Sequence, residues 1–168
     1  LNIAGPIEIY GGNTVVEGEI VTTASGANIT IEGTAGITVG ANVSATSTGD
    51  IVFNGPTTLT DDVTFSGNNM TLGGLDGGGH SVEFDLSNTE IDASTQSFTN
   101  IVDLTVTGAA TINGTIQTTG DQLFQGATKM IGDTTLLSGA GEINLSSGVN
   151  NGSTALTLGD GAQTGNIF

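Results

Sequence analysis

Short segments in which apolar and polar residues alternate run along the whole chain, and they constrain the fold more than any other feature. Examples are Ile29-Thr30-Ile31, Val82-Glu83-Phe84-Asp85-Leu86 and Leu156-Thr157-Leu158. An alternation of period two places the apolar residues on one face of an extended strand and the polar residues on the other. Gly, Asn and Asp separate the segments and favour tight turns, whereas no stretch has the apolar spacing of a stable helix. The sequence therefore predicts an all-β protein built from many short strands.

Two stretches of the chain are similar to each other at a fixed offset. Thr48-Gly49-Asp50 recurs as Thr119-Gly120-Asp121, so the offset runs from position 48 to position 119. Phe53 and Phe124 are separated by the same offset. Self-similarity at a fixed offset is the mark of a repeat architecture, and three coils of about 24 residues would account for it. We therefore interpret the chain as a parallel β-solenoid of roughly seven coils.

The charge of the chain limits its partners. Among 168 residues, 17 are Asp or Glu and one is basic, Lys129, so the formal net charge is −16. A chain without a basic patch cannot neutralise phosphates, which argues against nucleic acid and against anionic membranes as partners. Cys is absent, which excludes disulfides, thiolate nucleophiles and Cys-ligated zinc. Because 36% of the residues are hydrophobic, we nevertheless expect a folded chain.

The acidic residues are interpreted first as an outer coat that keeps the rod soluble. Glu83 and Asp85 lie on the strand face opposite Phe84, so we expect them to point to solvent. Calcium binding is the alternative, because Ca²⁺ prefers carboxylate and carbonyl oxygens as ligands. The tandem repeat of calcium-binding β-rolls is missing, which leaves only weak calcium candidates: Asp61, Asp62, Asp76, Glu83 and Asp85. We predict no other cofactor.

Some of the same acidic residues could instead take part in catalysis. Asp61-Asp62 could supply paired carboxylates for glycoside cleavage, and His80 could carry a proton. The chain has no Arg, its charge would repel acidic polysaccharides, and His80 follows three glycines as a corner residue would. We therefore predict that the protein is not an enzyme, with a polysaccharide-active β-helix as a weak alternative. Ice binding is weaker still, because Thr-x-Thr pairs such as Thr58 and Thr60 do not recur at one spacing.

Two runs carry a resemblance to a known family. Residues 49–64, with the sequence GDIVFNGPTTLTDDVT, resemble the repeats of bacterial surface exoproteins of the filamentous-haemagglutinin and autotransporter-passenger kind. Residues 75–82, LDGGGHSV, resemble a corner sequence of right-handed parallel β-helices. The resemblance implies a right-handed coil and an extracellular, rod-like adhesive or scaffolding role. It supplies no catalytic residues.

These interpretations combine into one expectation for the whole chain. Residues 1–168 are predicted to form a single right-handed parallel β-helix, as part of a longer rod or as a fibre-forming subunit. The strand-like pattern at Leu1 and at Ile167-Phe168 leads us to expect end-to-end stacking with flanking repeats or other copies. A host surface or a glycan is the further partner considered. By parity, the bulky inward residues are expected to be Phe53, Phe65, Phe84, Phe98 and Phe124.

Overall fold

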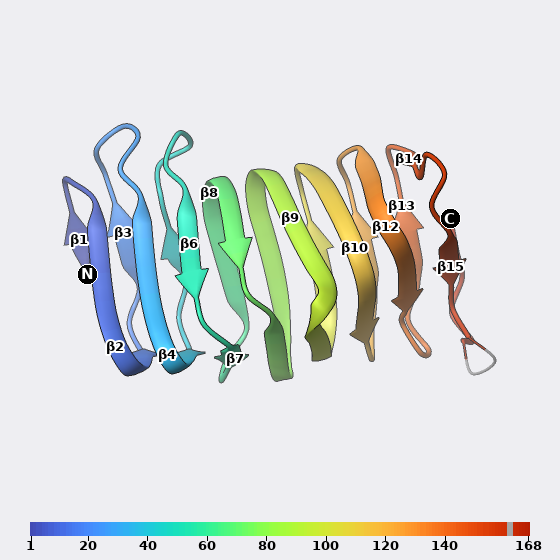
Figure 1. Ribbon diagram of the computed structural model, residues 1–168, viewed down its shortest axis with the longest axis horizontal. Coiled ribbons are helices and arrows are strands. Elements are labelled where there is room, and N and C mark those ends of the chain that lie inside the picture. Colours follow the sequence, from blue (N-terminus) through green and yellow to red (C-terminus); the bar gives the residue numbers. More distant parts are fainter. Residues whose placement is uncertain (161–162) are drawn as a thin grey trace.

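Each coil of the chain pairs in parallel with the coil before it and the coil after it. A computed structural model describes residues 1–160 and 163–168 and shows the coils stacked along one axis, with the N-terminus near one end and the C-terminus near the other (Figure 1). All strand pairings between named strands are parallel. The strands are β1 (Asn2–Ile3), β2 (Ile7–Val16), β3 (Ile20–Thr22), β4 (Ile29–Val39), β5 (Val43–Ser44), β6 (Ile51–Asn54), β7 (Thr57–Leu59), β8 (Val63–Leu72), β9 (Leu75–Val106), β10 (Ala109–Thr118), β11 (Gln122–Phe124), β12 (Thr128–Leu137), β13 (Ile143–Leu145), β14 (Val149–Asn150) and β15 (Leu156–Leu158).

The pairings define three faces, which we number in chain order and describe by the column of residues that the pairing aligns on each. The first face carries the column Ile7, Ile29, Ile51, Met70, Thr89, Ala110, Thr128 and Val149. The second face carries Thr14, Ile37, Thr57 and Leu75, and further along Phe98, Ile116, Leu136 and Leu158. The third face carries Ile20, Val43, Phe65 and Phe84, with Leu104, Gln122, Ile143 and Ile167 beside it in later coils. The predicted parallel β-solenoid of about seven coils is therefore confirmed.

The coils are shorter than the sequence repeat suggests, and they differ in length. The number of residues from one coil to the next is larger between the paired Ile29 and Ile51 than between Met70 and Thr89 or between Ala110 and Thr128. The coil length expected from the repeat is wrong, because Phe53 lies on the first face and Phe124 on the third. The offset between Phe53 and Phe124 therefore covers three complete coils plus two more faces of the next coil. The similarity reflects a pattern shared by the corners of different faces rather than whole coils.

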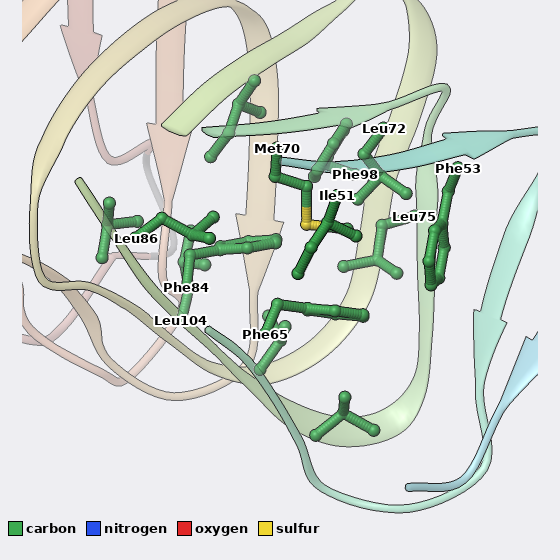
Figure 2. Packing of buried hydrophobic residues seen from close by; sticks show 14 of the residues in the cluster. Ile51, Phe53, Phe65, Met70, Leu72, Leu75, Phe84, Leu86, Phe98 and Leu104 are labelled. Carbon is green, nitrogen blue, oxygen red and sulfur yellow. The ribbon is translucent and has the colours of Figure 1, made fainter. Parts of the chain in front are cut away.

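Apolar side chains fill the space between the three faces. The five phenylalanines predicted to point inward are 0–1% exposed. The ring of Phe65 packs edge-on against Phe53 at 5.5 Å and stacks on Phe84 at 5.7 Å between centroids (Figure 2). Neighbouring coils place like residues about 4.8 Å apart, so each inward side chain packs directly on those of adjacent coils. The alternation in the sequence supplies the inward apolar side chains, and the parallel pairing of the coils stacks them into this continuous core.

The described part of the chain contains no helix of the length and apolarity needed to cross a membrane.

Candidate functional site

Polar side chains at the corners tie each coil to the next. Seven of the described Asn and Asp residues accept a hydrogen bond from a backbone N–H one coil further on, at 2.7–3.2 Å. We call them corner acceptors: Asn28, Asn42, Asp50, Asp62, Asp103, Asp121 and Asp133. A side-chain oxygen in this position satisfies a backbone donor where the chain turns between faces. The corner acceptors therefore continue the strand ladders around the bends.

This role explains the repeat in the sequence. Asp50 and Asp121, which match each other in the repeat, accept from the N–H of Asn69 and Glu142 respectively. The two acids occupy corners between different pairs of faces, yet each makes the same kind of bond. The signal missed in the sequence is an Asn or Asp directly before an inward residue, as in Asp121-Gln122. Interpreting these acids only as a solubilising coat was therefore incomplete.

Acidic residues gather at the corner between the second and third faces. The connections between these faces contain eight described acids: Glu17, Glu19, Asp61, Asp62, Asp103, Asp121, Glu142 and Asp160. In the connection that leads from Leu75 on the second face to Val82 on the third, this corner is occupied by His80 and Ser81 instead. The corner is thus a negative edge that lacks acids in two connections, at residues 40–42 and at His80-Ser81.

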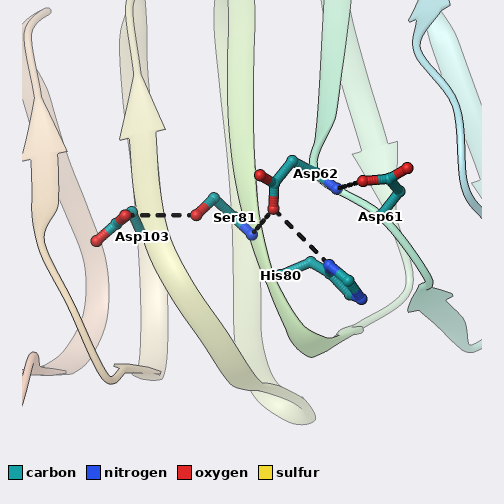
Figure 3. Close-up of polar contacts among 5 residues, drawn as sticks. All are labelled: Asp61, Asp62, His80, Ser81 and Asp103. Carbon is teal, nitrogen blue, oxygen red and sulfur yellow. Dashed lines mark hydrogen bonds and ion pairs between the residues drawn. The ribbon is translucent and has the colours of Figure 1, made fainter.

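A shallow groove of about 450 Å³ opens beside this edge on the third face. It is lined by Asn42, Asp62, Val63, Thr64, Ser81, Val82, Glu83, Asp103 and Thr105. Asp62 Oδ1 accepts from the N–H of Ser81 at 2.8 Å, and Ser81 Oγ donates to Asp103 Oδ2 at 3.4 Å (Figure 3). His80 Nδ1 lies 3.8 Å from Asp62 Oδ1, close enough for an ion pair when the imidazole is protonated. The groove therefore presents carboxylates and hydroxyls next to each other, and the imidazole of His80 lies beside it, near Asp62.

The calcium candidates do not form one cluster. Asp61 and Asp62 stand at the acidic corner, and Glu83 lines the groove beside Asp62. Asp85 lies further along the same strand, whereas Asp76 lies on the second face next to Thr58. Within residues 1–160 and 163–168 there is no group of three or more His, Cys, Asp or Glu that could hold a metal ion. Calcium binding stays a prediction that needs its own test.

The proposed catalytic carboxylates already serve the backbone. Asp61 Oδ1 accepts from the N–H of Asp62 at 2.8 Å, and Asp62 Oδ1 from Ser81 as described. The Asp62 side chain is 73% exposed and that of His80 34%, so neither lies in the desolvated pocket that commonly tunes a general acid or base. The arrangement can bind polar groups or small cations, and it offers little for proton transfer.

Two pKa shifts occur at the first face, away from this groove. The hydroxyl and backbone N–H of Ser94, together with the Asn113 amide, hold the pKa of Asp92 below its usual value. The negative charge of Glu8 raises the pKa of Tyr10. Both groups are at the surface, so the shifts come from neighbouring polar groups more than from burial.

No family model, no curated protein and no solved structure matches this chain.

Proposed function

We propose that the chain is a rod-like structural and adhesive segment of a secreted or cell-surface protein. The observation that carries this proposal is the unbroken parallel pairing of the first face, which runs from Ile7 to Val149. Seven steps of about 4.8 Å give a stiff column roughly 35 Å long. A scaffold of this kind displays polar side chains at regular intervals while every inner strand is protected by its neighbours. The sequence resemblance to surface exoproteins supports the extracellular location.

The proposal assigns no enzymatic activity. Asp62 and Asp103 in the third-face groove are exposed and each accepts a backbone hydrogen bond, which supports a structural role for them. The negative surface supports neither nucleic acid nor an anionic membrane as partner. Release of reducing sugar from a panel of neutral and acidic glycans would contradict this part of the proposal.

A self-assembling fibre subunit is the second candidate. In the described chain β1 pairs only with β3, and β2 pairs only with β4, so one edge of each strand is open. A further coil, supplied by flanking repeats or by another copy, would find backbone donors and acceptors arranged for parallel pairing. Leu1 and Tyr10, which are 61% and 63% exposed in this first coil, would gain cover from such a neighbour.

The two candidates differ in how the protein behaves with concentration. We expect electron microscopy of negatively stained protein to show short rods of uniform width, and the folded chain to resist proteases. A particle mass from light scattering that stays constant from micromolar to millimolar protein supports the rod segment and contradicts self-assembly. Growth into filaments of the same width supports the fibre subunit. Irregular globular particles would contradict both.

A further inference from the structure

A second groove lies on the second face, beside the connections that lead to it from the first face in three neighbouring coils. Its volume is about 420 Å³, and it is lined by Pro56, Thr57, Thr58, Gly74, Leu75, Asp76, Gln96, Ser97 and Thr99. It shares no lining residue with the third-face groove. The size is within the range of small-ligand sites. It is a separate candidate site with its own chemistry.

Gln96 forms the wall of this groove, and a glycine beneath it makes the arrangement possible. Gly74 has a φ of +112°, and a Cβ atom added there would lie 2.9 Å from Gln96 Cβ and 3.0 Å from its Oε1. A side chain at position 74 would therefore be strained and would displace Gln96. The glutamine amide thus lies close to the backbone of Gly73 and Gly74, just before the second-face residue Leu75.

Asp76 supplies the single carboxylate of the groove. Its Oδ1 accepts from the N–H of Gly78 and from Asn100 Nδ2, both at 3.0 Å. These two bonds orient the carboxylate, and Oδ2 accepts no hydrogen bond within the described chain. Around it lie groups that both donate and accept: the hydroxyls of Thr58, Ser97 and Thr99 and the amide of Gln96.

We propose that this groove binds one or two units of a neutral saccharide. Adjacent sugar hydroxyls can donate to the Asp76 carboxylate and can accept from the Gln96 amide and the threonine hydroxyls. An acidic sugar would be repelled by Asp76 and by the net charge of −16. The lining contains no aromatic ring on which an apolar ligand or sugar face could stack. Hydrogen bonding to a neutral polyol is therefore the recognition that the groove supports best.

This inference rests on the proposed adhesive function and names its ligand class and site. Without an aromatic platform each site should be weak, with a Kd of about 1 mM or higher. Adhesion would then depend on many rods displayed together, because linked sites gain effective concentration.

The test is an NMR titration of the full, isotope-labelled chain with neutral oligosaccharides, in parallel with oligosaccharides of uronic acids. We expect saturable shifts of the Gln96, Ser97 and Thr99 amides with a neutral sugar, and weaker or no shifts with uronic acids. Gln96→Ala and Thr58→Val should each weaken binding at least about fivefold. Thr115→Val is the matched control, because Thr115 is exposed on the same face but outside the groove.

Circular dichroism checks that each variant keeps its sheet signal, and the second groove variant covers the case in which one misfolds. Absence of saturable shifts at about 50 mM of every neutral sugar would overturn the inference, as would tighter binding of uronic acids or an equal loss in Thr115→Val. Rods that bind no neutral sugar overturn only this site. Saccharide binding by a protein that forms no rods would instead contradict the proposed scaffold.

Discussion

The carboxylate of Asp121 accepts a hydrogen bond of 2.9 Å from the backbone N–H of Glu142, one coil further along the solenoid. The N–H of Asp121 itself donates to Asp103 Oδ1 at 2.7 Å. Three acids therefore stand on consecutive coils, about 4.8 Å apart, and each of the first two satisfies a backbone donor of the next. The arrangement combines a favourable hydrogen bond with repulsion between like charges.

Replacement of Asp121 separates these two effects. In Asp121→Asn an amide oxygen can still accept from Glu142, as Asn42 does from Thr64 elsewhere, while one charge of the column is removed. We expect its thermal midpoint at low salt to equal or exceed that of the wild type, with the difference shrinking in about 0.5 M salt. Asp121→Ala loses the acceptor and should unfold about 2–4 °C lower. Thermal circular dichroism at two salt concentrations measures both, and an Asn variant as unstable as the Ala variant would contradict this role for the charge.

Gly108 lies where the chain turns from the third face to the first. A Cβ atom there would overlap the Leu86 carbonyl oxygen, on the preceding coil. Gly108→Ala should therefore force neighbouring coils apart and cost about 1–3 kcal/mol in the free energy of unfolding. Gly12→Ala is the control, because nothing lies within 4 Å of a Cβ at Gly12. Urea unfolding measures both variants, and an equal effect would show that close backbone approach is not the cause.

Gln122 is a polar residue in an apolar column, fully buried between Leu104 and Ile143. Its Nε2 donates to the Leu137 carbonyl at 2.8 Å, while its Oε1 has no partner within the described chain. Gln122→Leu removes an unsatisfied acceptor but also the donor to Leu137, so its unfolding free energy should change by less than about 1 kcal/mol. Gln122→Ala leaves a cavity as well and should cost about 2–4 kcal/mol. Equal destabilisation of the two variants in urea would indicate that the Leu137 hydrogen bond dominates.

Asp92 links stability to pH. Because its pKa is lowered in the folded state by Ser94 and Asn113, the unfolded chain binds more protons at acidic pH. The stability that ionised Asp92 contributes is complete above the unfolded pKa of about 3.9 and is lost as the pH falls through the folded pKa. Asp92→Asn should therefore lose less stability between about pH 5 and 3 than the wild type, by a small amount since Asp92 is exposed. Ser94→Ala, which removes one donor to Asp92, should also reduce the loss of stability at acidic pH. Urea midpoints at four pH values measure this dependence for each variant. A steeper dependence of stability on pH in Asp92→Asn than in the wild type would contradict the linkage.

Calcium should add little stability. Asp62 and Glu83 line one groove, but Asp76 lies on another face, so these candidates cannot share one ion. We expect the same thermal midpoint in excess calcium and in a chelator at matched ionic strength. A rise that occurs with calcium but not with magnesium or sodium, and that is lost in Asp62→Asn, would reveal a specific site.

The extent of sequence prediction differs between the core and the corners. Phe65 was predicted to point inward because alternation with period two depends only on the geometry of an extended strand. The length of a coil was predicted wrongly, because Asp50 and Asp121 repeat a corner motif that three different faces share. A local sequence motif predicts the turn that it forms, but it does not predict which face of the solenoid follows that turn.

The candidate grooves show the same limit. Asp62 was selected with its neighbour Asp61, and Glu83 with Asp85, as two separate acidic groups. Coil-to-coil register brings Asp62 and Glu83 together in the third-face groove. The second-face groove was not predicted, because Thr58 and Gln96 are far apart in the sequence and belong to different coils. No local pattern connects them.

The sequence by itself determined that the chain is all-β and which apolar side chains face the core, whereas the short strands expected from the alternation are merged in places, as in β9. These properties follow from alternation and from turn residues, which act over a few neighbouring positions. Only the tertiary structure decided the register between coils, and with it the corner hydrogen bonds, the acidic edge and the two grooves. Register depends on how strands of neighbouring coils align, and the coils differ in length, as the pairs Ile29–Ile51 and Ala110–Thr128 show. Each such variation moves the outward side chains relative to those of the neighbouring coil, so residues that share a groove are related by packing rather than by a fixed spacing in the sequence.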